Sequence, residues 1–238
     1  LAVRLADAPF MDTATHARRM ERLFGLAEGR CSRVWVGVEQ EFAAAASTAS
    51  AHPVARHDAP TRVLFYGQFI PLHGIPAIIE AARILRGEPV HWTIVGQGQE
   101  APRIRAMLDA EPLPALRWLD WIEYAQLRRE IVSVDVCLGI FGTSDKAGSV
   151  IPNKAFQILA TGRPLITRDS GAMRELLGEE RSDVALVPAG DASALAAAVL
   201  QWRRRPPVPD PGRDELNART TPAAIGLQLL RVLQGARA

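Results

Sequence analysis

The chain has 238 residues, 48% of them hydrophobic and 23% charged, which predicts a folded core and excludes general disorder. Its formal net charge of +2 is too small, and too evenly spread, to indicate a nucleic-acid-binding protein. Cys31 and Cys137 lie far apart without flanking metal ligands, which favours two free thiols in a reducing compartment. The sequence has no apolar run of about 18 residues, the length that would predict a membrane span, so we expect a cytoplasmic protein.

The first part of the chain precedes a stretch of small residues. Residues 5–11 and 31–38 are predicted to be strands, with a helix over 13–26 between them. Residues 43–60 are low in complexity, which is typical of a linker. A strand–helix pair without further partners cannot form a domain, so we interpret residues 1–42 as the end of a domain whose first part is absent.

Short apolar runs alternate with amphipathic helices through the centre of the chain. This alternation predicts an α/β fold, a doubly wound, Rossmann-like parallel sheet of about six strands. A Pro-rich break and a terminal helix over 222–235 follow it. The six strands are predicted at residues 61–67, 91–96, 116–121, 134–141, 164–168 and 183–190.

Ligands of such sheets bind beyond the carboxyl ends of the strands, and glycines are concentrated in these loops. Glycine lets backbone N–H groups approach an oxyanion closely, although a glycine after a strand is often only part of a turn. The glycines concerned are Gly67, Gly74, Gly96, Gly98, Gly142, Gly148 and Gly171.

The only two lysines of the chain fall at one junction between a loop and a helix. Asn153 is expected to cap a helix over 154–161, with Lys154 in its first turn. Because a helix N-terminus attracts anions, this junction predicts a phosphate site. We interpret Lys154 as part of that site and Lys146 as a solvated loop charge.

Motifs for other ligand classes are absent from the sequence. The stretch GQGQE (96–100) lacks the third glycine of a dinucleotide fingerprint, and there is no phosphate loop of the Walker type. No cluster of His, Cys or Asp has metal-ligand spacing, so we expect neither a metal nor a cofactor. Of the five histidines only His73 lies in a candidate ligand loop, and structural roles are expected for His16, His52, His57 and His91.

Four stretches of the chain form a pattern when they are taken in order: RVLFYGQFIPLHGIPAIIEAARIL (62–85), WTIVGQGQE (92–100), VDVCLGI (134–140) and IPNKAFQILATGRPLITRDSGAMREL (151–176). Together they resemble the group 1 glycosyltransferases (glycosyltransferase family 4). The resemblance is to the C-terminal, donor-binding half of a two-domain GT-B enzyme and covers roughly residues 61–200. It implies that residues 1–42 end the N-terminal acceptor domain and that 61–205 form a nucleotide-sugar-binding domain. Residues 206–238 would carry a helix that crosses back towards the first domain.

The chain departs from the family pattern at four positions. An Arg and a Lys that grip the nucleotide diphosphate in the family correspond here to Gln68 and His73. Two glutamates that contact the donor sugar and the ribose correspond to Ser149 and Gln157. The stretch IPNK (151–154) is similar to a Pro-x-Lys variant found in some relatives.

The resemblance implies transfer of a sugar from a nucleotide diphosphate, with retention, to a sugar or lipid-linked acceptor. We expect a UDP-sugar in preference to a GDP-sugar. Gly67 and Gly74 would bring the first loop to the phosphates, and His73, if protonated, and Lys154 would neutralise the leaving diphosphate. The remaining donor contacts implied are Gln68, Gly96 and Gly98, the backbones of Gly148, Ser149 and Val150, the backbones of Trp121 and Ile122 at the base, and Gln157 at the ribose.

Three alternatives stay open. The first is a non-catalytic, glycosyltransferase-like binding module, the second a GT-B sugar-nucleotide epimerase, and the third an ordinary Rossmann dehydrogenase. We expect the isolated chain to bind donor without turnover, because its cleft has one wall. The basic run WRRRPP (202–207) is interpreted as a solvated helix end, with peripheral contact to the inner face of an anionic membrane as the alternative.

Overall fold

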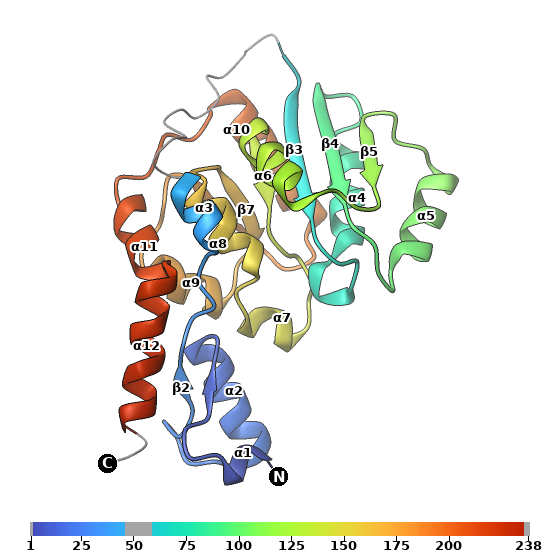
Figure 1. The fold of residues 1–238 in the computed structure, drawn as a ribbon. Helices are drawn as coiled ribbons and strands as arrows, with labels where there is room; N and C mark the ends of the chain where they lie inside the picture. The colour runs from blue at the N-terminus through green and yellow to red at the C-terminus, as the bar shows by residue number, and fades with distance from the viewer. Residues whose placement is uncertain (1, 46–58, 236–238) are drawn as a thin grey trace.

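The structure, a computed structural model, describes residues 2–45 and 59–235 (Figure 1). Most of the predicted linker over 43–60, together with His52 and His57, lies outside the described residues. The centre of the chain is one parallel sheet with the strand order β5-β4-β3-β6-β7-β8. The predicted six-stranded α/β fold is therefore confirmed. Its strands are β3 (Thr61–Tyr66), β4 (Val90–Val95), β5 (Leu116–Leu119), β6 (Val136–Leu138), β7 (Leu165–Arg168) and β8 (Val184–Val187).

Helices cover both faces of the sheet, which buries the apolar strands. Alternate residues of β3 face opposite cores. Val63 and Phe65 belong to the core under α4 (Ile75–Ile84), α5 (Ala101–Ala110) and α10 (Ala192–Arg204). Leu64 and Tyr66 belong to the core on the other face. That face is covered by α3 (Gln40–Ala45), α6 (Tyr124–Ser133), α8 (Asn153–Ala160) and α9 (Gly171–Leu177).

The strand order reverses between β3 and β6, and the loops that follow these two strands therefore diverge at one edge of the sheet. The loop after β3 contains a short 3-10 helix, η1 (Pro71–His73). The loop after β6 contains α7 (Asp145–Ser149). The sequence predicted a loop at α7; the structure corrects this, because the Ser144 hydroxyl accepts from the Ala147 amide and caps a helical turn.

The N-terminal segment differs from its prediction at both strands. The predicted strand over 5–11 begins within helix α1 (Ala2–Leu5), and only β1 (Phe10–Met11) is extended and paired. The predicted strand over 31–38 is reduced to β2 (Ser32–Arg33). β1 and β2 pair only with each other among the described residues, so the remaining residues have no ladder partner. The predicted helix is confirmed as α2 (Ala14–Phe24).

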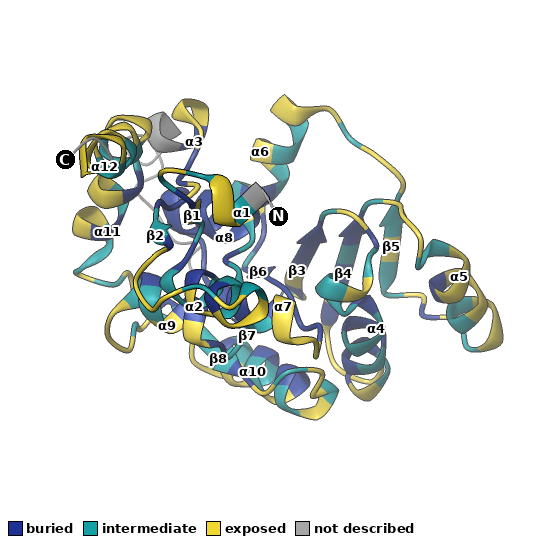
Figure 2. Cartoon of the chain, turned by 90° about the horizontal axis from the view of Figure 1, so that it is seen from below, coloured by how far each residue is buried: buried dark blue, intermediate teal, exposed yellow. Residues whose placement is uncertain are grey.

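Two helices end the described chain. The terminal helix predicted over 222–235 is α12 (Pro222–Gly235), and α11 (Arg213–Thr220), which was not predicted, precedes it. α12 lies beside β2 and away from the sheet (Figure 1) and has no buried residue (Figure 2). The chain thus crosses twice between the sheet and the N-terminal segment.

Candidate donor site at the switch-point edge

The glycines of the predicted site hold neighbouring loops against one another. Gly74 has a φ of +66°, and a Cβ there would lie 2.5 Å from the carbonyl carbon of Phe141. A Cβ on Gly96 would overlap the Gly67 carbonyl, and one on Gly98 would lie 2.6 Å from a carbonyl oxygen of the same loop. These glycines are therefore required for loop packing, independently of any approach to a ligand.

Lys154 occupies the first turn of α8 and reaches over the end of β3. Its Nζ lies 3.9 Å from the centre of the Phe65 ring, and a Cβ on Gly67 would lie 2.9 Å from it. The residue is 5% exposed, and its Nζ has no hydrogen-bond partner among the described residues. Burial lowers the pKa of this amine well below its usual value. The edge of the sheet therefore holds a buried amine that lacks a counter-charge.

The start of α8 is not capped as predicted. Pro152, not Asn153, is the N-cap residue, and no side chain accepts from the first turn. The helix begins at Asn153 because Pro152 has extended dihedral angles, with φ −69° and ψ 142°. An N-terminus without a side-chain cap leaves N–H groups of the first turn for another acceptor.

His73, which we expected to carry a positive charge when protonated, is instead bonded within its own loop. Its Nδ1 donates to the carbonyl of Gln68, and its ring packs edge-on against Phe65. Burial, followed by the nearby Lys154 charge, lowers the pKa of His73 to about 3. The imidazole is therefore neutral at pH 7 in this chain. The positive charge that we expected from a protonated His73 is absent, and the Lys154 amine is the basic group that lies beside Gly67.

The segment around α7 is held by backbone contacts. The Ser149 hydroxyl donates to the Asp145 carbonyl at 2.7 Å, while the Ser149 carbonyl accepts from the Thr13 hydroxyl. Gly148 lies against a guanidinium, since a Cβ there would be 3.2 Å from Nη2 of Arg168. Lys146 is exposed on α7, in agreement with its interpretation as a solvated charge.

The sequence reasoning gave no role to Arg168, although this residue begins one of the loops at the carboxyl ends of the strands. Arg168 ends β7, and its Nη1 donates to the carbonyls of Gly142 and Ser144. The side chain therefore braces the loop that leads into α7. An Arg at the end of a buried strand of the predicted sheet was the available signal.

Gln157, which we predicted to contact the ribose, is buried and bonded to protein groups. The Tyr66 hydroxyl donates to its Oε1 at 2.9 Å, and its Nε2 donates to Oε1 of Glu39 at 2.9 Å. Both ends of the amide therefore have protein partners. Trp121 and Ile122 lie between β5 and the start of α6 at Tyr124, and Trp121 is 71% exposed.

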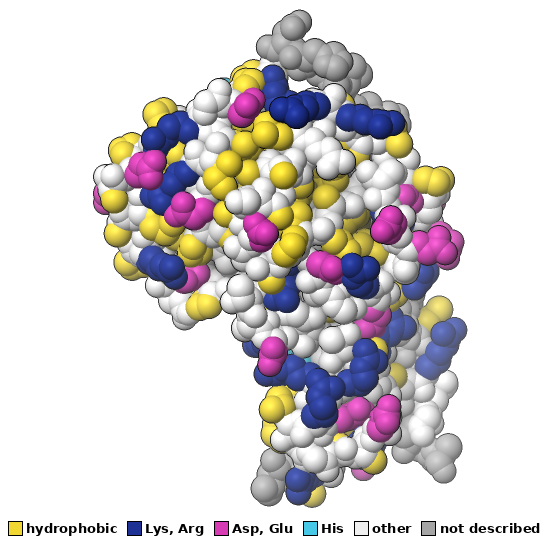
Figure 3. All heavy atoms as spheres, turned by 180° about the vertical axis from the view of Figure 1, so that it is seen from behind, with side chains coloured by type: hydrophobic (Ala, Val, Ile, Leu, Met, Phe, Trp, Pro, Cys, Tyr) yellow, Lys and Arg dark blue, Asp and Glu magenta, His cyan; other side chains and the backbone are white. Residues whose placement is uncertain are grey.

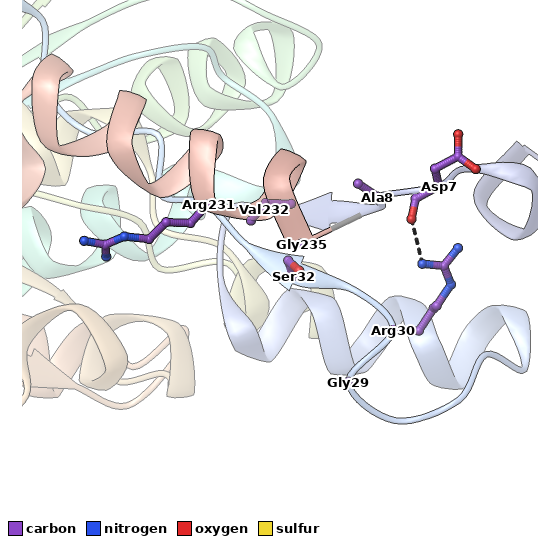
Figure 4. A pocket seen from close by; sticks show the side chains of 8 residues that line it. All are labelled: Asp7, Ala8, Gly29, Arg30, Ser32, Arg231, Val232 and Gly235. Carbon is purple, nitrogen blue, oxygen red and sulfur yellow. Dashed lines mark hydrogen bonds between the residues drawn. The ribbon is translucent and has the colours of Figure 1, made fainter. Parts of the chain in front are cut away.

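A separate pocket of about 430 Å³ lies between α12 and the N-terminal segment (Figure 4). In it Arg30 donates to the Asp7 carbonyl at 2.9 Å. None of the predicted donor-binding residues lines this pocket. The lining residues are Asp7, Ala8, Gly29, Arg30, Ser32, Arg231, Val232 and Gly235.

Charge is distributed unevenly over the surface. Basic side chains gather over the N-terminal segment (Figure 3), and the sequence of α2 in this segment includes Arg18, Arg19 and Arg22. Over the sheet the two signs are interspersed (Figure 3). In residues 2–45 and 59–235 no helix is long and apolar enough to span a membrane. The same residues contain no group of three His, Cys, Asp or Glu side chains placed to hold a metal.

The profile of the family described as "Glycosyl transferases group 1" matches residues 60–204. The chain belongs to the group 1 glycosyltransferases. It is 28% identical over 141 residues to WcaI of Escherichia coli strain K12, described as a colanic acid biosynthesis glycosyl transferase. That match covers 58% of this chain and 34% of WcaI, so the chain spans about a third of its relative.

Solved glycosyltransferase structures share the fold of this family member. Anabaena HepE, crystallised with UDP and glucose, superposes with a TM-score of 0.75 at 14% identity, covering 98% of this chain and 64% of HepE. Sucrose-phosphate synthase of Thermosynechococcus elongatus superposes with a TM-score of 0.72 at 20% identity, covering 95% and 57%. The GT-B fold predicted from the sequence is thus confirmed.

Proposed function

We propose that this chain forms the nucleotide-sugar-binding part of a retaining glycosyltransferase that uses a UDP-sugar. The observation that carries the proposal is Lys154, a buried amine without a partner at the switch-point edge. Burying a charged amine is costly, so its retention there is best explained by an anion that binds beside it. Family membership and the UDP bound to HepE support a nucleoside diphosphate as this anion.

Each group near Lys154 has a defined task in this proposal. The diphosphate would lie between Lys154 and the uncapped first turn of α8, where the amine and the N–H groups stabilise the leaving group. A bound diphosphate would favour the charged amine, since an opposite charge raises the pKa of a lysine. The backbones of Trp121 and Ile122 would contact the edge of the base, and the neutral His73 would help to fix the conformation of the loop after β3.

The test is a calorimetric titration of the chain with UDP, GDP, ADP and pyrophosphate. We expect UDP to bind most tightly, and Lys154→Ala to weaken both UDP and pyrophosphate at least about tenfold, the loss of one charge-assisted contact. Lys146→Ala is the matched control, because it removes an exposed lysine from the same junction. Binding of no diphosphate would refute the donor site and leave only the fold.

Transfer itself is tested on a protein that contains the complete acceptor half. Release of UDP and formation of a glycosylated acceptor with retained anomeric configuration support the proposal. UDP binding without transfer favours the non-catalytic module, to which the neutral residues Ser149 and Gln157 point. Conversion of the UDP-sugar into its epimer would identify an epimerase instead.

A further inference from the structure

Glu39 places a carboxylate beside the candidate donor site from a distant part of the sequence. It lies between β2 and α3, on the first crossing of the chain, and its side chain is on the surface. Its Oε1 accepts from Nε2 of Gln157 at 2.9 Å across 118 residues of sequence. The Tyr124 hydroxyl is a second partner: burial, followed by the Glu39 charge, raises the pKa of Tyr124 to about 12. The carboxylate is therefore oriented by two neutral groups.

The support behind Glu39 is buried and fully bonded. Gln157 is 6% exposed, and its Oε1 accepts from the Tyr66 hydroxyl, which fixes which end of the amide faces Glu39. Burial also raises the pKa of Tyr66 well above its usual value, so that phenol remains a donor at neutral pH. A carboxylate held in this way loses little rotamer freedom when it accepts further hydrogen bonds.

Within the described part of the chain, no Lys, Arg or His forms an ion pair with Glu39. An ionised carboxylate can accept about four hydrogen bonds, and Gln157 and Tyr124 use only some of these positions. The Glu39 carboxylate is thus held in one orientation and can still accept further hydrogen bonds.

The position of Glu39 selects the part of a nucleotide that can reach it. Its partner Gln157 lies three residues after Lys154 on α8, on the same helix face and about 4.5 Å further along the axis. Its other partner, Tyr124, starts α6 directly after Trp121 and Ile122. Through these two partners the carboxylate contacts both the helix that carries Lys154 and the start of the helix that follows the proposed base position, which fits the place of a ribose between diphosphate and base.

We propose that Glu39 binds the 2′- and 3′-hydroxyls of the ribose and that Gln157 is its positioning residue. This inference rests on the proposed function. A carboxylate can accept from both hydroxyls of a cis diol at once, and an acidic side chain serves ribose hydroxyls in the same way in other nucleotide-binding sheets. The ribose contact thereby comes from the crossing segment and not from α8.

The test compares UDP with 2′,3′-dideoxy-UDP on the wild-type chain and on Glu39→Gln, by calorimetry. We expect wild type to bind UDP at least about tenfold more tightly than the dideoxy compound, the value of hydrogen bonds to a charged group. In Glu39→Gln this preference is expected to fall to about twofold, with pyrophosphate affinity unchanged. Glu41→Gln is the matched control, since it removes an equal charge from α3.

The outcomes separate this inference from the function on which it rests. If wild type binds neither UDP nor pyrophosphate, the donor site itself fails. If wild type binds UDP and Glu39→Gln still prefers UDP over the dideoxy compound by about tenfold, Glu39 is not the ribose contact. An equal loss of pyrophosphate binding would also overturn it, because that would indicate a structural role. Gln157→Ala is expected to lower the hydroxyl preference alone, and Gln157→Asn to restore part of it.

Discussion

Lys154 is expected to lower the stability of the folded chain while it supports nucleotide binding. The folded chain holds its Nζ among aromatic rings with no acceptor among the described residues, which costs free energy of folding. We expect Lys154→Met to raise the free energy of unfolding by about 1–2 kcal/mol, because it keeps the volume and removes the buried charge. The same variant should lose most of its UDP affinity.

Urea denaturation and calorimetry on one preparation test this trade-off. Lys146→Met, at an exposed position, should change neither quantity appreciably. A destabilised Lys154→Met would show that the amine already has a favourable environment in the free chain.

His73 provides a prediction about pH. Its pKa is about 3 in the folded chain against an ordinary value near 6.5, so between these values the unfolded chain binds more protons. The free energy of unfolding is therefore expected to fall as the pH falls from about 6.5 towards 3. His73→Gln should flatten this dependence, as measured by urea denaturation at pH steps between 7 and 4. An unchanged slope would contradict the shift, and exposed His91→Gln is the control.

At the scale of elements, the loops after β3 and β6 pack closely against each other at Gly74. Gly74→Ala would force a left-handed φ of +66° on an alanine and push its Cβ against the Phe141 backbone. We expect a loss of about 2 kcal/mol or more in the free energy of unfolding, together with weaker UDP binding. Gly87→Ala is the control, because nothing lies within 4 Å of its Cβ and its φ is not left-handed. Equal stability of the two variants would refute this role.

The strands and long helices were predictable because their signals are local. The residues of β3 form an apolar run that is buried on both faces of the sheet and bounded by Pro60 and Gly67. The unbroken run and these two boundary residues were enough to predict the strand. Helices α7 and α11 were missed because short helices depend on a cap or on tertiary contacts rather than on a periodic apolar face.

The candidate site was predictable only in part, for the same reason. Lys154 stood out as one of two lysines, next to the start of a helix. The contact between Glu39 and Gln157 joins residues 118 positions apart, and no local pattern encodes it. The neutral state of His73 depends on burial and on Lys154, which become apparent only once the loops are folded.

At the scale of the whole molecule, a buried charge network ties α11 to the sheet. Asp183, before β8, is 1% exposed and pairs with Arg181 at 3.3 Å and with Arg213 of α11 at 2.8 Å. We expect Asp183→Asn to lower the free energy of unfolding by about 3 kcal/mol, because it removes the buried carboxylate that Arg181 and Arg213 share.

Urea denaturation of matched variants tests the network. Asp169→Asn removes the partner of Arg174 from an exposed pair at 2.6 Å and should cost several-fold less. If the two variants are equally destabilised, the network is no more than a surface pair.

The two crossings of the chain contact each other around Val38. The Val38 amide donates to the Thr220 carbonyl at 2.9 Å, and a Cβ on Gly37 would lie 2.6 Å from the Ile225 side chain. A rotation of the N-terminal segment would have to turn about this pivot, and the contacts that Thr13 and Glu175 make away from it would have to break first. Glu39 is the residue next to the pivot, so it would move least. Glu39 would therefore keep its contact with a bound nucleotide whether the N-terminal segment is rotated towards the sheet or away from it.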